Sequence, residues 1–468
     1  MQEPIGMSEF SVRGTRVVVV GGAASGTAAA RLLAERGARV TLTDVRPAID
    51  GQDALRLIGV DLVLGANPPD LLAHAGLVIV SPGVPLTHPA IQAARQCGVP
   101  VLGEIELASR WLRGRMVAIT GTKGKSTTTA LTGRILAQAG FDAPVGGNIG
   151  TPLSSYVSAS RPDTIHVVEV SSFQLETTDT FHPWIAALLN VTADHLDRYA
   201  NLQEYARAKA RIFAQQTEAD WAVVNADDPQ TLALASQGRA RQTAFARHAA
   251  IDAGVTVDHD WVVEVAGGTS THLVHTSDVR LIGQHLLSDV LAAAAIARLA
   301  GVSAEAIAQA VSSFRGLEHA MEWVDDIRGV RFVNDSKATN VDAAAQAIET
   351  FEPGLVVIMG GKFKGGDLRT LRPRLASRMA TVVAIGEARP LIHDAFDGGV
   401  TVVDATTMAD AVRAAFAAAS PGASVLLAPA CASFDMFENY AARGLAFKAE
   451  VARLRVERGE GGRIVTTA

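Results

Sequence analysis

The stretch that most constrains this chain is Met116–Thr129, which reads MVAITGTKGKSTTT. An apolar segment enters a glycine-containing turn, and the turn ends in Gly124-Lys125-Ser126, where a helix is expected to begin. Glycines let successive N–H groups and the helix N-terminus point at an anion, while the lysine and the hydroxyl suit phosphate oxygens and Mg²⁺. The strict phosphate-loop pattern has its first glycine at the position of Ile119, whereas here it is Gly121. We interpret the stretch as a variant phosphate loop; the alternative is an ordinary strand-to-helix turn.

Length, charge and cysteine content limit the class of protein. At 468 residues the chain exceeds one ordinary hydrophobic core, and about three domains are expected. The net charge of −6, with both signs mixed along the chain, offers no basic face for nucleic acid or anionic lipid. Cys97 and Cys431 lie in unrelated apolar stretches, which favours a reducing compartment. With no secretory signal pattern and no apolar stretch of spanning length, the sequence predicts a cytoplasmic protein without membrane insertion.

The first third has the pattern of a nucleotide-binding α/β unit that ends near Gly103. The apolar segment Val17–Val20 runs into Gly21–Gly26, and Asp44 closes the next expected strand. A dinucleotide fingerprint has glycine at its third place, where Ala23 stands here, and the methyl group crowds the path of a pyrophosphate. Asp44 occupies the place of a ribose-binding acid, or it only closes a loop. A dehydrogenase is therefore the weaker hypothesis, and a unit for another nucleotide-like ligand is the prediction.

Two strand ends in the middle third carry polar residues. Glu169 lies inside the apolar run Ile165–Val170, and a buried carboxylate needs a metal, a cation or a proton as its partner. The run Ile185–Asn190 empties into a loop that carries Asp194, His195 and Asp197. Oxygen ligands with one imidazole suit Mg²⁺ that retains water, although an ordinary solvated loop has the same composition.

Lys209 interrupts the apolar face of the next expected helix. Leu202, Tyr205, Ile212 and Phe213 recur with it at three- and four-residue spacing and share one face. A lysine on such a face either extends its amine to solvent or is modified or neutralised to serve a site. Both interpretations stay open at this point.

The last third repeats the pattern of strands that end in polar loops. Val330–Val333 leads to NDSKATN (334–340), Leu355–Met359 leads to GGKFKGGD (360–367), and Val425–Ala428 leads to PACASFDMFENY (429–440). The lysines of the second loop would clamp a carboxylate or phosphate, or they are ordinary surface lysines. A further α/β unit with ligand-facing strand ends is the prediction.

Six motifs in a fixed order carry a family resemblance. They are GTKGKST, EVSSFQLE, NVTADHLDR, the helix with Lys209, NDSKATN and PACASFDMF. From about Val17 to Phe447 the chain resembles the Mur ligases. The resemblance implies an α/β, three-domain Mur ligase architecture: a Rossmann-like N-terminal domain for the UDP substrate (1–103), a central P-loop ATPase-like domain that binds ATP (104–314), and a Rossmann-like C-terminal glutamate-binding domain (315–468).

The resemblance also implies an activity, namely ATP-dependent amide ligation in peptidoglycan precursor synthesis. ATP would phosphorylate the terminal carboxylate of UDP-MurNAc-L-Ala, and the amine of D-glutamate would displace phosphate from the acyl phosphate. Bringing two anions together requires a cluster of cations. NDSKATN and ACASFD are the motifs most particular to the glutamate-adding member, and a monomer is expected.

The roles of individual residues follow from the resemblance alone. ATP would be bound by Gly121, Thr122, Lys123, Gly124, Lys125, Ser126, Thr127, Asp335 and Lys337. The UDP substrate would be bound by Ser25, Asp44, Arg46, Ser81, Asn148 and His195, and glutamate by Thr339, Lys364, Ser433, Phe434 and Tyr440. Two Mg²⁺ ions would involve Ser126, Glu169, His195 and Lys209, and catalysis Lys125, Glu169, His195 and Lys209. Lys209 would be carbamylated, which turns a cation into a carboxylate-like group.

Some positions depart from the family pattern. Lys123 replaces an asparagine of the phosphate loop, and Leu286 and Asp289 replace two asparagines on the adenine side. Ala320 stands where an arginine near the ATP phosphates is expected, so that Arg315 or Lys337 would have to compensate. The alternatives are a ligase that takes L-glutamate, a folate polyglutamate ligase, which the leading nucleotide-type unit opposes, and a non-catalytic nucleotide-binding protein.

Overall fold

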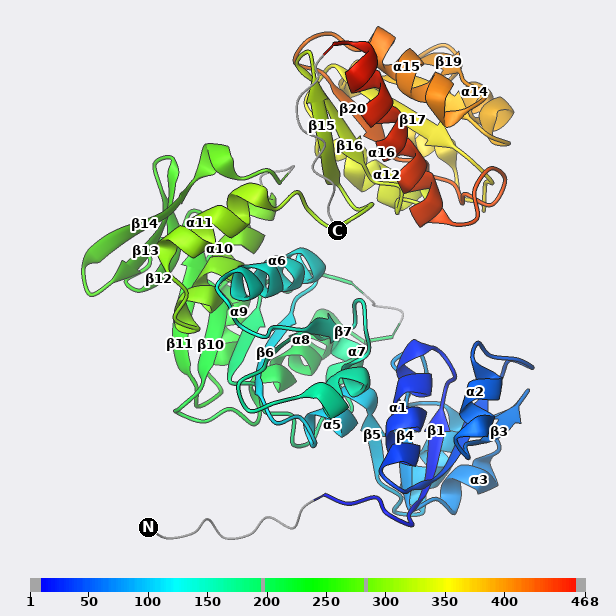
Figure 1. Ribbon diagram of the computed structural model, residues 1–468, viewed down its shortest axis with the longest axis vertical. Helices are drawn as coiled ribbons and strands as arrows, with labels where there is room; N and C mark the ends of the chain where they lie inside the picture. Colours follow the sequence, from blue (N-terminus) through cyan, green and yellow to red (C-terminus); the bar gives the residue numbers. More distant parts are fainter. Residues whose placement is uncertain (1–9, 195–197, 282–284, 460–468) are drawn as a thin grey trace. The chain divides into compact units, whose positions relative to one another are not determined.

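The computed structural model describes residues 10–194, 198–281 and 285–459. By its internal contacts the chain forms two compact units, Met1–Thr276 with Ser288–Val311 and Ser277–Leu287 with Ser312–Ala468. The first unit contains two β-sheets and the second contains one (Figure 1). The α/β fold class expected from the sequence is confirmed. No described helix has the length and apolar character needed to cross a bilayer.

The N-terminal sheet is wholly parallel, in the order β3-β2-β1-β4-β5, and both of its faces are covered. Alternate residues of β1 point to opposite faces, so that Val17 and Val19 join one apolar cluster and Val18 and Val20 join another. The elements are β1 (Arg16–Val20), α1 (Ala24–Glu35), β2 (Arg39–Asp44), α2 (Gln52–Leu57), β3 (Asp61–Leu64), α3 (Pro69–Ala73), β4 (Leu77–Val80), α4 (Pro89–Gln96) and β5 (Val101–Gly103).

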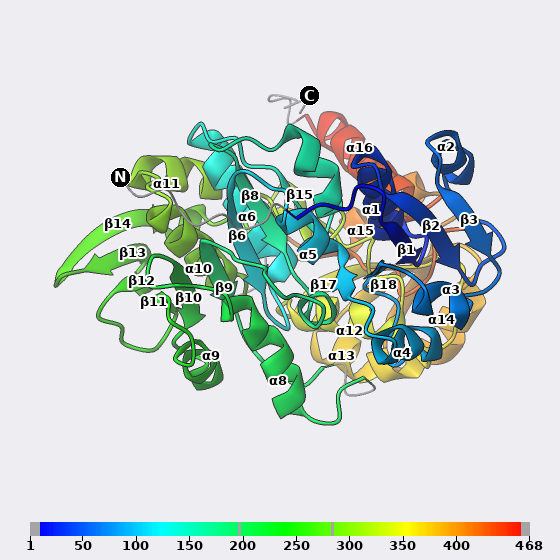
Figure 2. The same cartoon turned by 90° about the horizontal axis from the view of Figure 1, so that it is seen from below.

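The second sheet of this unit has nine strands in the order β14-β13-β12-β11-β10-β9-β6-β8-β7. Seven strands, β6 to β12, pair in parallel, and β13 and β14 extend the sheet from β12 by antiparallel pairing at one edge (Figure 2). The strands are β6 (Arg115–Thr120), β7 (Val145–Gly147), β8 (Ile165–Glu169), β9 (Ile185–Leu188), β10 (Trp221–Asn225), β11 (Arg241–Ala246), β12 (Gly254–Asp258), β13 (Trp261–Ala266) and β14 (Thr269–His275). The helices are α5 (Glu104–Ser109), α6 (Lys125–Gln138), α7 (Ser172–Leu175), α8 (Leu202–Ala210), α9 (Pro229–Ala235), α10 (His285–Leu299) and α11 (Ala304–Ser313), with 3₁₀ turns at Leu153–Ala159, Arg211–Phe213 and Thr276–Asp278.

The expected boundary after Gly103 falls inside this first unit, because β5 ends at Gly103 and α5 begins at Glu104 with no linker between them. Each sheet still lies within one of the three expected ranges, and the exact domain boundaries stay a prediction. The helix that carries Lys209 is α-helical to Ala210 and continues as a 3₁₀ turn.

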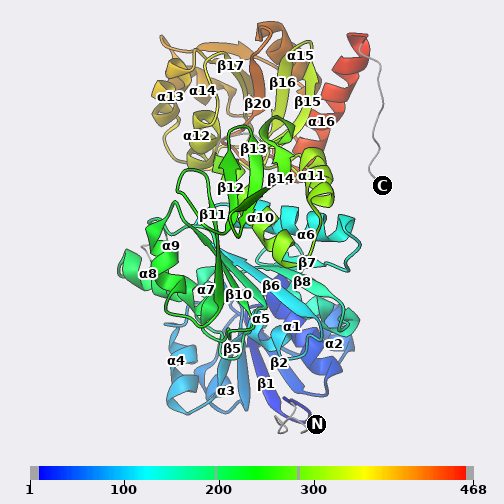
Figure 3. The ribbon, with the colours of Figure 1, turned by 90° about the vertical axis from the view of Figure 1, so that its left-hand side faces the viewer.

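The C-terminal sheet has the order β15-β16-β20-β17-β18-β19, parallel except for the β15–β16 hairpin. Figure 3 shows α12–α14 on one face and α15 and α16 on the other. Asn340 and Asn439 cap α12 and α16 by accepting backbone N–H groups, which ends the loop before each helix. The elements are β15 (Glu322–Ile327), β16 (Val330–Asn334), α12 (Val341–Glu349), β17 (Leu355–Gly360), a 3₁₀ turn (Leu368–Leu371), α13 (Arg372–Ser377), β18 (Thr381–Ile385), α14 (Arg389–Phe396), β19 (Thr401–Asp404), α15 (Met408–Ala418), β20 (Ser424–Leu427) and α16 (Tyr440–Glu457).

Candidate active site

The glycine loop joins β6 to α6 as the sequence predicts. Gly124 has φ +81°, and a methyl group on it would lie 2.1 Å from Oδ1 of Asp289, so both the conformation and the space require glycine. Oδ1 of Asn190, just after β9, accepts from the backbone N–H of Thr122 (3.1 Å) and of Lys123 (2.9 Å). The loop is therefore fastened to the neighbouring strand while α6 begins at Lys125, with Ser126 and Thr127 in its first turn.

Two lysines converge on the carbonyl group of Gly121. Lys125 Nζ donates to Gly121 O at 2.9 Å and to Thr122 O at 2.8 Å, and Lys209 Nζ donates to the same Gly121 O at 2.7 Å. Lys209 is 1% exposed and lies 4.4 Å from the centre of the Tyr205 ring. The hypothesis that this lysine extends to solvent is therefore wrong.

Burial and mutual repulsion shift the protonation of these lysines. Burial, and then the charge of Lys125, lower the pKa of Lys209 to about 7. Burial also lowers the pKa of Lys125, against the opposing effect of Glu169 and Asp194. A lysine whose pKa lies near 7 is partly neutral at physiological pH, and the neutral amine is a nucleophile.

Glu169, the last residue of β8, is a buried carboxylate with one unsatisfied oxygen. It is 1% exposed, and its Oε1 accepts from Asn148 Nδ2 at 2.7 Å. Its Oε2 has no hydrogen-bond partner among the described residues. An orphaned carboxylate oxygen beside a phosphate-type loop fits a bound cation such as Mg²⁺.

Other expected metal ligands follow β9. His195 and Asp197 lie outside the described residues, and Asp194 is exposed. Among the described residues no three His, Cys, Asp or Glu side chains gather as a metal site. A cation at Glu169 would therefore rely on Ser126, water and ligand oxygens, as Mg²⁺ commonly does.

Four residues expected to bind the UDP substrate line one pocket of about 400 Å³ in the first unit: Ser25, Asp44, Ser81 and Asn148. Asp44 accepts from the N–H of Gly22 (2.6 Å) and forms a two-bond ion pair with Arg46 (2.9 and 2.7 Å). The Arg46 hydrogen bond, stronger than the opposing effect of burial, holds the pKa of Asp44 well below its usual range. Asp44 is therefore a fixed carboxylate that closes this loop, and its contact with a ribose stays a prediction.

Gln174 also lines this pocket, although sequence reasoning gave it no role. Its Oε1 accepts from the N–H of Ser171 at 2.9 Å, which completes a capping box at the start of α7. Its Nε2 is buried and has no partner among the described residues. The Ser-x-x-Gln spacing of EVSSFQLE was the available signal, because it fixes one end of the amide and leaves the other to a ligand.

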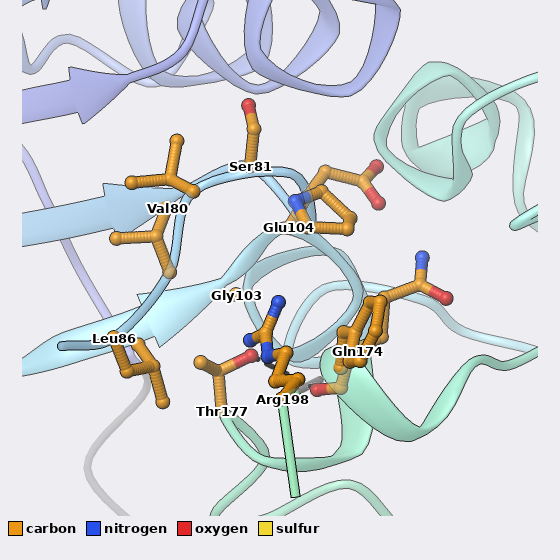
Figure 4. Close-up of a pocket in the computed structure, with 11 residues that line it drawn as sticks. Val80, Ser81, Leu86, Gly103, Glu104, Gln174, Thr177 and Arg198 are labelled. Carbon is orange, nitrogen blue, oxygen red and sulfur yellow. Dashed lines mark hydrogen bonds between the residues drawn. The ribbon is translucent and has the colours of Figure 1, made fainter. Parts of the chain in front are cut away.

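An adjacent cavity is too small for a substrate. Ser81, Glu104, Gln174 and Arg198 are among the residues that line it (Figure 4), and its volume is about 10 Å³. That is close to the space of a single water molecule. The larger pocket is therefore the candidate substrate site of this unit.

The C-terminal unit brings the remaining expected residues to the ends of β16, β17 and β20. Asp335 is buried, its Oδ1 accepts from the N–H of Met321 (3.2 Å), and burial raises its pKa to about 6. Lys364 Nζ donates to Thr339 Oγ1 at 3.4 Å. Ser433 is buried, whereas Lys337, Lys364, Phe434 and Tyr440 are exposed.

Three family profiles match the chain in sequence order. "Mur ligase MurD-like, N-terminal domain" matches residues 15–103, "Mur ligase middle domain" matches 119–297, and "Mur ligase, glutamate ligase domain" matches 319–431. This chain belongs to the Mur ligase family.

Individual Mur ligases resemble it over nearly their full length. The protein named UDP-N-acetylmuramoylalanine–D-glutamate ligase in Acidobacterium capsulatum is 48% identical over 444 residues, which is 94% of this chain and 96% of the relative. The protein of the same name in Solibacter usitatus is 44% identical, over 94% of this chain and 98% of the relative. Among solved structures, UDP-N-acetylmuramate–alanine ligase of Thermotoga maritima superposes with a TM-score of 0.55 at 19% identity, covering 95% and 100%. The MurF ligase of Thermotoga maritima in complex with ADP superposes with a TM-score of 0.54 at 16% identity, covering 95% of this chain and 96% of that chain.

Two departures from the Mur ligase pattern can now be placed. Ala320 lies half-buried in the turn before β15, between His319 (φ +63°) and Met321 (φ +49°). The backbone N–H of Lys337 donates to His319 O at 3.0 Å, whereas the charge of Arg315 acts on Asp326. Arg315 is also joined to this region, because its carbonyl oxygen accepts from the N–H of Trp323 at 3.0 Å. Both candidates to replace the missing arginine therefore stay open.

Asp289 is the second departure. It is 5% exposed, and one of its carboxylate oxygens has no partner among the described residues. Burial raises its pKa well above the usual range. A neutral carboxylic acid at this position offers one donor and one acceptor, as the usual asparagine amide does.

Proposed function

We propose that this chain is the ATP-dependent ligase that adds D-glutamate to UDP-N-acetylmuramoyl-L-alanine in peptidoglycan precursor synthesis. The relatives that carry this name are 40–48% identical and align with 94–95% of the chain. The activation of one substrate by ATP supports the cytoplasmic location that the sequence predicts. A monomeric state stays a prediction.

The observation that carries the proposal is the convergence of Lys125, Lys209 and the unsatisfied Glu169 oxygen around the phosphate loop. Transfer of a phosphoryl group to a carboxylate brings two anions together, and fixed cations lower the energy of that encounter. In the proposed reaction Lys125 and the loop N–H groups hold the ATP phosphates. Mg²⁺, when bound through Ser126 and Glu169, would supply further positive charge to those phosphates.

The uridine nucleotide substrate and glutamate have separate sets of candidate residues. The pocket with Ser25, Asp44, Ser81 and Asn148 would hold the uridine nucleotide, with Arg46 orienting Asp44. Thr339, Lys364, Ser433, Phe434 and Tyr440 would hold glutamate, and Asp335 and Lys337 would contact ATP. His195 would serve the substrate and a second Mg²⁺ ion. The amine of glutamate then attacks the acyl phosphate carbon, an amide forms, and phosphate leaves.

The proposal also includes a covalent modification, the carbamylation of Lys209. The neutral amine would attack CO₂, form an N–C bond and release one proton to solvent. The product changes the cluster of Lys125, Lys209 and Glu169 from two cations and one anion to one cation and two anions. Two anions beside a phosphate loop suit Mg²⁺ better than two ammonium groups do.

The carbamate can be tested by supplying ¹³C-labelled bicarbonate at neutral pH and recording ¹³C NMR spectra of the active protein. We expect one protected carbamate resonance, which the Lys209→Met variant lacks and the Lys123→Met variant keeps. An active preparation that contains only free amine at Lys209 would contradict this part of the proposal.

The activity itself is tested by phosphate release from ATP and Mg²⁺ with UDP-MurNAc-L-Ala, in the presence of D-glutamate, L-glutamate or neither. We expect release that requires both the nucleotide substrate and D-glutamate. Preference for L-glutamate would select the related ligase, and no turnover would select a non-catalytic protein.

A further inference from the structure

Arg443 lies near the start of α16 and contacts the loops that carry the proposed glutamate residues. These loops follow β16, β17 and β20 and cover 335–340, 361–367 and 429–439. The three strands are parallel neighbours, so their C-terminal ends meet at one edge of the sheet. Thr339 belongs to the first loop, Lys364 to the second, and Ser433 to the third.

The guanidinium group joins the first loop to the third. Its Nε donates to Ser336 Oγ at 3.0 Å and its Nη2 to Ser336 O at 2.8 Å, while Nη1 donates to Cys431 O at 3.0 Å. Ser336 Oγ in turn donates to Tyr440 O at 2.7 Å. One planar group thus fixes the distance between two loops whose chain positions are about a hundred residues apart.

The second loop packs against the same group. Gly361 has φ +128°, and a methyl group on it would lie 3.3 Å from Arg443 Nη1 and 2.2 Å from Ala432 O. Backbone hydrogen bonds in both directions join Lys362 to Ala432, at 2.9 and 3.0 Å. The position of Lys364, two residues further on, therefore depends on the same contact.

The arginine is buried and forms no ion pair among the described residues, although the charge of Asp435 acts on it. Arg443 is 1% exposed, and no ion pair joins it to a carboxylate in the part of the chain that the structure describes. Burial lowers the pKa of Arg443 to about 10, so the group stays charged at neutral pH. Carbonyl and hydroxyl oxygens satisfy its donors, and the charge of Asp435 on the third loop offsets part of the effect of burial. The group therefore acts at these loops chiefly through the geometry of its hydrogen bonds.

We propose that Arg443 is the positioning residue of the glutamate site, holding Thr339, Lys364 and Ser433 in one arrangement through Ser336, Gly361 and Cys431. The proposal rests on the proposed function, because it assigns these loops to glutamate. A buried cation contributes little to stability compared with an apolar side chain of its size, whereas its fixed fork sets geometry at three points. Arg443 itself touches no substrate in this assignment.

The test compares Michaelis constants for the two substrates that ATP couples. In Arg443→Met, which keeps the length but removes the donors, we expect the Michaelis constant for D-glutamate to rise at least tenfold. The constant for UDP-MurNAc-L-Ala should change less than twofold, because its candidate residues lie in the other compact unit. Arg443→Lys keeps the charge but not the fork, and an intermediate rise of three- to tenfold is expected.

Leu454→Ala is the matched control for a purely structural role. Leu454 is on the same helix, 1% exposed, in the apolar cluster with Phe332 and Phe447. It should lower the melting temperature while leaving the D-glutamate constant within twofold. If Arg443→Met does not fold, Arg443→Lys carries the same comparison.

The role of Arg443 would be overturned by a D-glutamate constant that stays within twofold in the arginine variants, or by an equal rise for both substrates. Leu454→Ala raising the D-glutamate constant as much as Arg443→Met would also overturn it. Phosphate release by the wild-type protein separates the proposed function from the proposed role of Arg443. Without D-glutamate-dependent phosphate release the proposed function fails, and this role fails with it, whereas normal wild-type release with unchanged variants rejects only the arginine.

Discussion

The phosphate-loop region of the first unit and the strand-end loops of the C-terminal unit satisfy their buried charges in opposite ways. Around the phosphate loop, two lysines share one carbonyl oxygen and Glu169 Oε2 has no partner among the described residues. In the C-terminal unit, the buried guanidinium of Arg443 has acceptors for Nε, Nη1 and Nη2, and Lys337 and Lys364 are exposed.

This difference indicates where ligands enter the electrostatic balance. Unsatisfied buried charge is costly, so the phosphate-loop region gains stability when phosphate, a cation or CO₂ completes it. In the C-terminal loops the donors of Arg443 have acceptors without a ligand, and Asp435 Oδ1 is the atom there that lacks a partner among the described residues. The exposed side chains of these loops receive a ligand on a fixed frame. Substitutions in the first region should therefore change chemistry most, and those in the second should change binding or stability.

The largest effect is expected for Lys125→Met. The substitution removes the cation nearest the proposed phosphates, and loss of one such group costs about 2.7–4 kcal/mol, or roughly 100- to 1000-fold in kcat. Steady-state phosphate release with both substrates measures it. A loss below tenfold would show that the two regions do not differ as described.

Much of the phosphate-loop region could be predicted from the sequence because its residues sit in local patterns. Gly124-Lys125-Ser126 opens a helix, Glu169 interrupts an apolar strand and Lys209 interrupts an apolar helix face. Each anomaly is visible within a few residues. The structure buries both Glu169 and Lys209, although the sequence left the burial of Lys209 open.

The frame of the C-terminal unit could not be predicted in the same way. Arg443 stands on a helix whose sequence has no strong polar and apolar faces, and its partners Ser336 and Cys431 are distant along the chain. Asp289 meets Gly124 through a contact that spans 165 positions, which no local pattern encodes. Only tertiary packing reveals such contacts.

A smaller effect is expected for Asp335→Asn, and it concerns the free energy of unfolding. Burial raises the folded-state pKa of Asp335 from 3.8 to about 6, so the folded protein binds more protons than the unfolded chain between these values. Stability contributed by this group is present below about pH 4 and is lost as pH rises through 6. The amide keeps an acceptor for the Met321 N–H, and at pH 7 the variant should be more stable by on the order of 2 kcal/mol.

Thermal unfolding of the ligand-free proteins from pH 4 to pH 7 measures this effect. The difference in melting temperature between variant and wild type should widen as the pH rises, and most of the change should fall between pH 4 and pH 6. A constant difference across this range would show that Asp335 does not titrate abnormally. The exposed Asp367, changed to asparagine, is the control without burial.

Next in size is Ala320→Arg, which restores a charge that the family pattern places near the ATP phosphates. Ala320 lies on the turn that Asp335 and Lys337 hold by hydrogen bonds on either side, so a side chain there starts beside both proposed ATP residues. A charge-assisted contact contributes about 1.5 kcal/mol, which corresponds to a roughly tenfold lower Michaelis constant for ATP. Ala320→Gln adds length without charge and should leave the constant unchanged; equal constants in all three proteins would mean that Arg315 or Lys337 already suffices.

The smallest effect is expected for Lys123→Asn, two residues from Lys125 on the same loop. The Lys123 side chain is exposed, and only its backbone bonds to Asn190, through N–H at 2.9 Å and C=O at 3.1 Å. A change of less than about twofold in kcat and in the ATP constant is expected, because the backbone N–H groups hold the loop and the phosphates. Asn190→Ala removes the side chain that fastens two of those groups, and it should exceed Lys123→Asn by roughly tenfold. A larger effect of Lys123→Asn than of Asn190→Ala would indicate that side chains, and not backbone N–H groups, hold the phosphates at this loop. Exposed lysines would then be as important here as in the C-terminal unit.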